Sequence, residues 1–549
     1  MVASLINRSK ELLKNEHKSI LSAAVIIGAS FLSSALLGLV RNHLLAARFF
    51  GGLEGDLDVY FAAFVIPDTI FQLLVVGAVS AAFIPVFQSY VLRGKEEGRE
   101  LANASLTTVG LVLSLISVLI LIFARPLAGI IAHFSPDKLD LMANLIRIMS
   151  VAQLLFTLSA FLTGILQAQR RFLIPAIAPL LYNLGTIIGI LLFSSRFGIY
   201  SAAIGVVLGA LFHVAIQLPL AKHLGFSPAL LFKPNHPGVR SITRLMPPRM
   251  LALGLDQVER WVAVNLASLM VPGSLSIFSF ARQLYALPVS LFGVSLSQAS
   301  FPTLSQEANN HDKTKFKATL SKSILEILFF ALPASVLVLV LRIPLVRIAF
   351  GARNFPWEAT LLTGRALALL SLSIAPLSIS QILVRSFHAL KNTRTPLYVG
   401  ASTMIIFISS SYFITNRLNL GILGITFAMS LANLLDFILL YLFLRRQIGG
   451  LAVGLRGLKM IAATIFTGIS LWIPMRLLDR FVFDTTRTIP LVILTLIVST
   501  LGFSVYLLFS KILRIEELGE VFRLAKKLGN WRHILVKSDE VIEPSPNGH

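Results

Sequence analysis

The sequence predicts an all-α integral membrane protein with about fourteen transmembrane helices, arranged as two parallel six-helix lobes around a central cavity plus two C-terminal helices. Three observations support this fold class. The 549 residues are 56% hydrophobic and only 13% charged, with a mean hydropathy of +0.81, which is more apolar than a soluble domain. Apolar runs long enough to cross a bilayer recur along the whole chain. Two sequence patterns also recur roughly 220 residues apart, as in transporters built from internal repeats.

Windows of about twenty residues, the length of one membrane-spanning helix, locate fourteen candidate spans. The first apolar run is far longer than the corresponding region of a cleavable signal peptide, so we expect it to remain as a helix. The predicted spans are 19–49, 58–91, 102–125, 139–168, 173–195, 200–221, 245–270, 274–306, 318–346, 357–390, 396–416, 420–444, 457–478 and 488–512.

Four prolines interrupt the longest of these spans, namely Pro67, Pro85, Pro288 and Pro302. Because proline has no backbone N–H and its ring clashes with the preceding turn, each one predicts a kink. We interpret them as candidate hinges for a movement between two states. A static kink is the alternative.

The internal repeat has two parts. "GAVSAAFIPVFQSY" (77–90) resembles "GVSLSQASFPTLSQE" (293–307), which aligns Pro85 with Pro302 at an offset of 217 residues. "ILQAQRRFLIP" (165–175) pairs with "SFHALKNTRTP" (386–396) at an offset of 221. A duplicated unit of six helices follows, and because six is even the two units run parallel. A chance match between alanine-rich helices is the alternative.

The charges of the loops set the orientation. Loops on the N-terminal side hold 30 Lys and Arg, and the opposite loops hold 10, so both termini are predicted to be cytoplasmic. The resulting divisions are a cytoplasmic basic segment at 1–18, an N-lobe at 19–222, a cytoplasmic linker at 223–242, a C-lobe at 243–446, a helix pair at 447–512 and a cytoplasmic basic tail at 513–549.

We single out three arginines that lie well inside predicted spans: Arg41, Arg147 and Arg282. A charge at bilayer depth costs roughly 2.5–3.5 kcal/mol, so it normally faces a cavity, a partner or the interface. We expect Arg147 to reach the membrane surface along its own span. Arg41 and Arg282 are predicted to face the central cavity, where two guanidinium groups indicate an anionic ligand such as a diphosphate headgroup. For Arg41, pairing with a neighbouring helix is the alternative.

Acidic residues in the C-lobe form two candidate sites. Asp256 and Arg260 are four residues apart, so they are predicted to pair on one helix face. Glu259 then remains as a counter-charge for Arg282 or as a coupling-ion or proton site, with a structural ion-pair network as the alternative. Asp436, with Asn433 one turn earlier, is a second candidate for cation or proton coupling.

Polar residues near the predicted ends of the first two spans complete the list of candidate residues. Asn42, His43, Asp58 and Asp68 lie near cavity or interface depth, and we assign them to gating, with substrate contact as a further possible role for the first three.

Several function classes are excluded or disfavoured. The chain has no cysteine, so it has neither disulfides nor thiolate metal sites. The net charge of +22 comes from loops between apolar runs rather than from a folded basic domain, which argues against nucleic-acid binding. A membrane glycosyltransferase or lipid phosphatase is a third hypothesis. The longest loop, 222–244, offers His223 and His236 without an acidic partner, and no nucleotide-binding, nucleophile-elbow or metal motif is present.

Five segments resemble signature segments of a known family: "LGLVRNHLLAARFFG", "LDVYFAAFVIP", "GAVSAAFIPVFQSY", "FARQLYALPVSLFGVSLSQASFPTLS" and "ALKNTRTP". They are similar to those of the MurJ (MviN) family, bacterial lipid II flippases of the multidrug/oligosaccharidyl-lipid/polysaccharide (MOP) exporter superfamily. The resemblance covers about 30–445. It implies a MurJ-like fold, a multi-pass protein of the bacterial inner membrane, and transport rather than catalysis.

The resemblance also implies roles for particular residues. Lipid II would cross from the cytoplasmic to the outer leaflet, with its diphosphate held by Arg41 and Arg282. The helix pair at about 457–512 would form a groove for the lipid tail. No cofactor is implied. A coupling ion or the membrane potential would supply the driving force, and protein partners are left open.

The sequence departs from the family pattern at five positions. Phe71 and Gln72 stand where members commonly carry an arginine pair, and Ala35, Asn42 and Val76 replace charged residues. Either another group substitutes, with Gln72 and Arg249 as candidates, or the substrate differs. The remaining hypothesis is therefore another MOP-type exporter, for a different polyprenyl-diphosphate glycan or for a cationic drug in exchange for sodium ions.

Overall fold

The computed structural model describes residues 20–77, 79–352, 354–483 and 487–519, with the side chains of 20–29, 31, 80, 81, 248, 249, 252, 256 and 479 excepted. The predicted basic N-terminal segment and most of the predicted basic tail lie outside this part of the chain. All regular elements of the described part are helical. This is the expected outcome for a bilayer protein, since a helix satisfies its own backbone N–H and C=O groups.

The helices follow one another with short connections. The N-lobe, named after its predicted boundaries, contains α2 (Ile20–Phe49), α3 (Glu54–Ala63), α4 (Val65–Ile70), η1 (Phe71–Val76), η2 (Val79–Phe83), α5 (Ile84–Val91), α6 (Lys95–Ile131), α7 (Pro136–Ala168), α8 (Leu173–Phe197) and α9 (Tyr200–His223). The C-lobe contains α10 (Pro237–Ala267), α11 (Ser274–Pro288), η3 (Val289–Val294), α12 (Ser295–Asn309), α13 (Lys313–Val340), α14 (Arg342–Phe350), α15 (Trp357–Ser371), α16 (Ile374–Ala389), α17 (Arg394–Arg417) and α18 (Ile422–Ile448). The C-terminal pair is α19 (Gly454–Phe481) and α20 (Thr488–Ile512).

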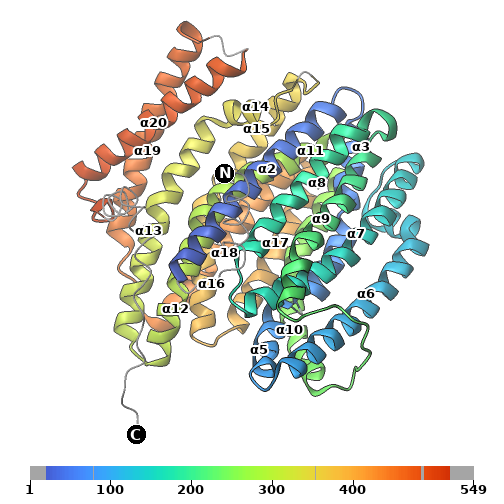
Figure 1. Cartoon of the computed structure of the whole chain (residues 1–549). Coiled ribbons are helices and arrows are strands. Elements are labelled where there is room, and N and C mark those ends of the chain that lie inside the picture. The colour runs from blue at the N-terminus through green and yellow to red at the C-terminus, as the bar shows by residue number, and fades with distance from the viewer. Residues whose placement is uncertain (1–19, 78, 353, 484–486, 520–549) are drawn as a thin grey trace, which may run out of the picture.

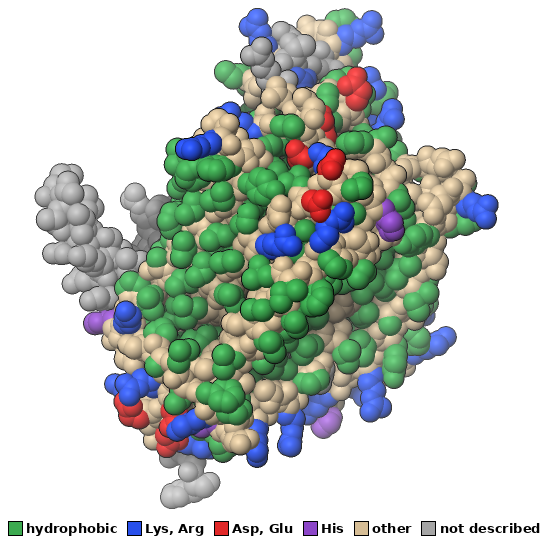
Figure 2. All heavy atoms as spheres, turned by 90° about the vertical axis from the view of Figure 1, so that its right-hand side faces the viewer, with side chains coloured by type: hydrophobic (Ala, Val, Ile, Leu, Met, Phe, Trp, Pro, Cys, Tyr) green, Lys and Arg blue, Asp and Glu red, His purple; other side chains and the backbone are tan. Residues whose placement is uncertain are grey.

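The long helices lie side by side in one bundle (Figure 1). The pair α19 and α20 packs against α13 at one edge of the bundle, and α6 lies at the opposite edge. Figure 2 shows that hydrophobic side chains spread over the middle of the face carrying α6, with Lys and Arg gathered along its lower margin and a group of basic and acidic side chains in its upper part. This distribution is typical of a surface that contacts lipid and ends at a charged interface.

Eleven described helical segments are long and apolar enough to cross a membrane, and twelve are if the bent pair α15 and α16 counts as one span. The helices α2 and α10 have 30 and 31 residues and are not among the twelve. The sequence of α10 carries Arg240, Arg244, Glu259 and Arg260, which lowers its hydropathy. The all-helical, multi-pass class is confirmed, while the total of fourteen spans stays a prediction.

Two predicted spans are broken where proline forbids a straight helix. The span predicted at 318–346 consists of α13, which ends at Val340, and the separate short helix α14. Pro344 causes this break, because its ring meets the carbonyl of Val340 four residues earlier. The span predicted at 357–390 bends by 44° between α15 and α16, where Pro376 has the same relation to Leu372.

Three of the described segments are π-helical: η1, η2 and η3. Pro85 lies at the start of α5 directly after η2, and Pro288 ends α11 directly before η3. Pro67 lies in α4, and Pro302 lies inside α12. The first residues of η1 and η3 are 218 positions apart, close to the offset of the sequence repeat. π-Helical segments within α-helices are frequent at functional sites. The hinge role of the four prolines stays a prediction.

Glycines allow α8 and α9 to pack unusually closely. A Cβ added at Gly185 would lie 2.4 Å from the Cα of Gly209, and one added at Gly189 would lie 2.4 Å from the Cα of Gly205. The glycines are four residues apart on each helix, so they form matching small-residue faces. Such faces bring helix backbones together in membranes, where the hydrophobic effect does not drive helices to associate.

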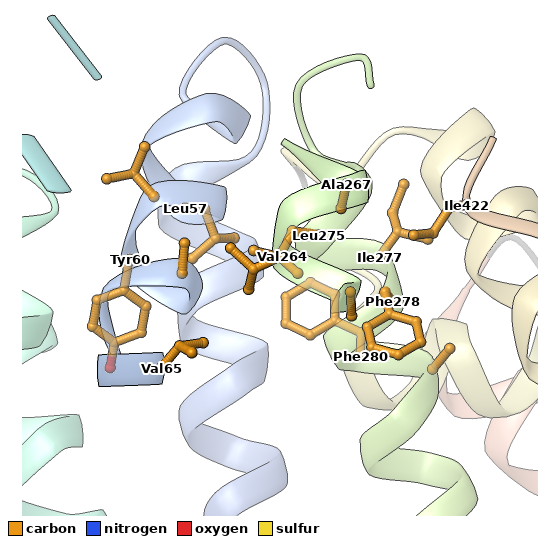
Figure 3. Close-up of a cluster of buried hydrophobic side chains, with 14 of the residues drawn as sticks. Leu57, Tyr60, Val65, Val264, Ala267, Leu275, Ile277, Phe278, Phe280 and Ile422 are labelled. Carbon is orange, nitrogen blue, oxygen red and sulfur yellow. The ribbon is translucent and has the colours of Figure 1, made fainter. Parts of the chain in front are cut away.

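A hydrophobic cluster joins the two lobes at the upper end of the bundle in Figure 1. Figure 3 shows Leu57 and Tyr60 of α3 on one side, and Leu275 and Phe280 of α11 on the other. Nearby, the ring of Phe280 stacks on Phe350 at a centroid distance of 4.4 Å. The cluster closes this end of the space between the lobes, which the loop charges predict to be the outer end.

Candidate functional site

A cavity of about 560 Å³ lies directly beside this closed end, between the N-lobe and the C-lobe. Its walls come from α2, α3, α4, α8, α10 and α11. The charged residues among its lining are Arg41, Asp68, Arg260 and Arg282. The cavity therefore collects three guanidinium groups and one carboxylate in one space.

Arg41, on α2, is held by neutral groups. Its guanidinium donates hydrogen bonds to the amide oxygens of Asn42 at 3.2 Å and Asn183 at 3.3 Å, and it lies 5.9 Å from the centre of the Tyr182 ring. Asn183 is itself fixed by hydrogen bonds to Ser34. Because these partners carry no charge, Arg41 keeps its positive charge uncompensated by them and points it at the cavity.

Arg282, on α11, has the partner that the sequence suggested. Its Nη2 lies 3.2 Å from Oε1 of Glu259 on α10. The pair stands between the first cavity and a second one of about 930 Å³, because Arg282 lines both. Arg41 and Arg282 thus face the same space, although their role in binding a diphosphate stays a prediction.

Arg260 has a different partner from the one its spacing suggested. Its Nη1 forms an ion pair with Asp68 on α4, whereas the spacing predicted a pair with Asp256, whose side chain lies outside the described ones. The Nε of Arg260 has no hydrogen-bond partner among the described residues. The nearby Trp261 indole donates a hydrogen bond of 2.9 Å to Thr69 on α4, so this part of α10 is fastened to the N-lobe.

The second cavity extends from Arg282 to the lower ends of α10, α16 and α17. Asp436 lines it together with Asn433 and Glu259. Asn433 donates a hydrogen bond of 3.0 Å to the hydroxyl of Tyr285. A carboxylate on the wall of a wide cavity suits a proton or cation site, and the coupling role of these residues stays a prediction. Within the described residues, three or more His, Asp or Glu side chains do not gather as a metal site would require.

The predicted gating residues lie at the contacts between the lobes. Asn42 donates a hydrogen bond from its side-chain amide to Gln283 on α11, and Nδ1 of His43 lies 3.1 Å from the backbone oxygen of Ala349. Asp58 is only 2% exposed, and its carboxylate accepts hydrogen bonds from the start of α11. All three therefore join α2 or α3 to the C-lobe.

Two other residues singled out from the sequence, Gln72 and Arg147, are not among the described lining residues of these cavities. Arg147 is half-buried and donates hydrogen bonds to Asn144 at 2.8 Å and to the backbone oxygen of Leu121 at 3.1 Å; that it reaches the membrane surface stays a prediction. The side chain of Arg249 lies outside the described ones. That Gln72 or Arg249 compensates for the missing arginine pair stays a prediction.

Sequence reasoning missed the contribution of α8 and the full role of Arg260. Tyr182 and Asn183 are neutral residues in an apolar helix, and no spacing pattern marks them. Arg260 was visible as a charge within a predicted span, but its proximity to Asp68, 192 residues earlier, depends on how α4 and α10 pack.

Comparison with known proteins places the fold. The solved structure described as "Lipid II flippase MurJ, inward closed conformation" is 24% identical, with a TM-score of 0.73, and covers 89% of this chain and 98% of its own. A multidrug resistance MATE family transporter of the MOP superfamily, in an inward-facing conformation, is 14% identical with a TM-score of 0.63, covering 77% of this chain and 98% of its own. The MOP-type fold predicted from the sequence is thereby confirmed.

Sequence relatives agree with this placement. The "Probable lipid II flippase MurJ" of Thermotoga maritima is 29% identical over 492 residues, which are 89% of this chain and 96% of the relative. The "Lipid II flippase MurJ" of Burkholderia cenocepacia is 26% identical over 435 residues, 77% of this chain and 84% of the relative. The relatives are named as flippases, which are transporters and not enzymes. The family model described as "Lipid II flippase MurJ" matches residues 45–503, and this chain therefore belongs to the MurJ family.

Proposed function

We propose that this protein moves lipid II, the undecaprenyl-diphosphate-linked disaccharide-pentapeptide, from the cytoplasmic to the outer leaflet of the bacterial inner membrane. Its relatives are named for this substrate. The observation from this chain that carries the proposal is the cavity between the lobes, in which Arg41, Arg260 and Arg282 face one space beside a closed end. Such a space suits a diphosphate, because guanidinium groups bind phosphate oxygens with two parallel hydrogen bonds.

The headgroup would enter from the lower end, where the second cavity lies, and its diphosphate would rest on Arg41 and Arg282. The halves would then rock about the axis between them, opening the upper end and closing the lower one. Asp68 compensates the charge of Arg260 and Glu259 compensates that of Arg282, so Arg41, with neutral partners, leaves the empty cavity with a net positive charge. A negative interior potential would draw this empty, positive cavity back toward the inside, at about 2.3 kcal/mol per charge and 100 mV.

The finer features of this proposal follow the sequence. Both termini would be cytoplasmic, as the excess of Lys and Arg in the loops of that side indicates. The helix pair α19 and α20, which packs against α13, would form a groove that holds the undecaprenyl tail outside the bundle. A proton or cation at Asp436 and Glu259, or the membrane potential alone, would drive the cycle. Asp256 and Asn433 remain further candidates for the coupling site.

A rescue experiment tests the proposal. Cells depleted of their own lipid II flippase should grow when this chain is supplied, and the Arg41→Ala and Arg282→Ala variants should fail at equal protein level. Asn144→Ala is a matched control, because it breaks an Arg–Asn contact at an exposed site. Rescue by both arginine variants would contradict the diphosphate clamp. Failure of the unaltered chain to rescue, with binding of another polyprenyl-diphosphate glycan, would replace lipid II as the substrate.

A further inference from the structure

The ion pair between Arg260 and Asp68 joins α10 of the C-lobe to α4 of the N-lobe. Both of its members line the cavity that holds Arg41 and Arg282, whereas of the Arg282–Glu259 pair only Arg282 lines that cavity. Both side chains remain partly accessible, at 35% for Arg260 and 22% for Asp68. A ligand in the cavity therefore has access to both partners, which a fully buried structural pair would not allow.

Asp68 satisfies only part of the Arg260 guanidinium. The pair runs through Nη1, while Nε is buried and has no hydrogen-bond partner among the described residues, so the part of the guanidinium that is open to the cavity is the Nη end. A guanidinium offers five N–H donors in a planar fork that matches two phosphate oxygens. Phosphate oxygens are thus direct competitors of the Asp68 carboxylate for the same donors.

The contacts between α10 and α4 indicate what would follow if an anion replaced Asp68 as the partner of Arg260. Besides the ion pair, α10 is fastened to α4 by the hydrogen bond from Trp261 to Thr69. Loss of the Asp68 contact would remove the charged part of this attachment between the lobes. Binding of an anion at Arg260 would therefore loosen α10 from α4 at the moment the cavity is filled.

We propose that Arg260 is a third anion-binding residue of the cavity, that Asp68 occupies it while the cavity is empty, and that a diphosphate displaces Asp68 and so releases one attachment between the lobes. This inference rests on the proposed function, since it takes the ligand to be a prenyl diphosphate. It assigns to Asp68 the role of a competitor, which opposes binding.

The competitor role makes a prediction that a structural role does not make. With farnesyl diphosphate as the probe, Arg260→Gln should weaken binding by about tenfold, because a charge-assisted hydrogen bond is lost. Asp68→Asn should tighten binding by about threefold or more, because the carboxylate no longer competes. In the double variant the affinity should equal that of Arg260→Gln alone. A structural ion pair would instead give weaker binding in both single variants.

Asp56→Asn is the matched control, because Asp56 pairs with Lys138 within one lobe, and it should leave the affinity unchanged. Arg260→Lys keeps the charge but loses the planar fork, so its affinity should lie between those of the unaltered chain and Arg260→Gln. This variant decides the question if Asp68→Asn does not fold. Unchanged or weaker binding by Asp68→Asn, or unchanged binding by Arg260→Gln, would overturn the proposal.

The release is tested separately with paired spin labels. The chain has no cysteine, so Ser89→Cys at the end of α5 and Asn309→Cys at the end of α12 can be labelled alone. Asp68→Asn should shift the distance distribution between these labels in the absence of ligand, and farnesyl diphosphate should shift the unaltered chain in the same direction. If farnesyl diphosphate binds and shifts the distance distribution of the unaltered chain and of Asp68→Asn by the same amount, the proposed release of α10 from α4 is wrong. Failure of rescue in depleted cells would overturn lipid II transport without affecting these two measurements.

Discussion

The carboxylate of Asp58 on α3 accepts two hydrogen bonds from Ser276 at the start of α11, one from the backbone N–H at 2.7 Å and one from the hydroxyl at 2.6 Å. It also accepts one from the N–H of Gly273 at 2.7 Å. The first N–H groups of a helix have no partner within the helix, so a carboxylate satisfies them and interacts favourably with the helix dipole. One buried carboxylate therefore caps a helix of the other lobe.

Asp58→Asn is expected to weaken the closure of the upper end. The Asn side chain has an NH₂ group where the carboxylate had an oxygen, and this group faces the N–H donors at the start of α11. Hydrogen bonds to a charged group contribute about 1.5–3 kcal/mol each, and this contribution is reduced in the variant. Leu275→Cys, buried in the adjoining cluster, should then react about tenfold faster or more with an impermeant maleimide from the outer side. An unchanged labelling rate would show that the hydrophobic cluster alone keeps this end closed.

Asn183→Ala is expected to weaken binding of the diphosphate, because Asn183 orients Arg41. The Asn183 side chain both accepts from the guanidinium and bonds to Ser34, so its loss frees Arg41 from its orientation toward the cavity. We expect binding of farnesyl diphosphate to weaken by about fivefold to tenfold, the loss of one oriented hydrogen bond. Asn144→Ala, which removes the exposed contact with Arg147, should leave it unchanged. Equal effects of the two substitutions would rule out a specific role for Asn183.

Gly189→Ala is expected to destabilise the protein without touching the cavity. The added Cβ would lie 2.4 Å from the Cα of Gly205, so α8 and α9 must separate, at a cost of about 1–3 kcal/mol for overpacking. The midpoint of thermal unfolding in detergent should fall by several degrees. Gly110→Ala is the control, because a Cβ there meets no atom within 4 Å, and its midpoint should stay the same or rise slightly. A normal midpoint for Gly189→Ala would contradict the close packing.

Asp436→Asn is expected to separate binding from transport if the carboxylate couples the cycle to a cation or proton. Asp436 lines the second cavity, whereas the three arginines share the first. The variant should therefore bind farnesyl diphosphate normally and fail to rescue flippase-depleted cells. Asp140→Asn, at an exposed ion pair with Arg125, should rescue. Full rescue by Asp436→Asn would contradict a coupling role for Asp436 and leave Glu259 or the membrane potential to drive the cycle.

The sequence predicted the cavity arginines because charge is costly in a bilayer. Arg41 and Arg282 stand out against apolar surroundings, and each must face water, a partner or a ligand. The sequence also offered Glu259 as a counter-charge for Arg282, beside a coupling-ion or proton site and a structural ion-pair network, and the structure contains the Arg282–Glu259 pair. The reasoning from cost did not find the partner of Arg260, because a pairing rule within one helix was applied where the partner, Asp68, belongs to another helix.

By itself, the sequence determined the class of the molecule: long apolar runs admit only helices that satisfy their own hydrogen bonds. Of the four prolines it named, Pro85 and Pro288 lie at junctions with π-helical segments, whereas Pro302 lies inside α12 and the breaks near Pro344 and Pro376 were not predicted. The tertiary structure decided the partners, because Asp68 meets Arg260, Asp58 meets Ser276 and Asn183 meets Arg41 across 142 to 218 residues of chain. Contacts of this kind depend on how the helices pack. Neither hydrophobic periodicity nor residue spacing along the chain predicts which side chains of distant helices meet.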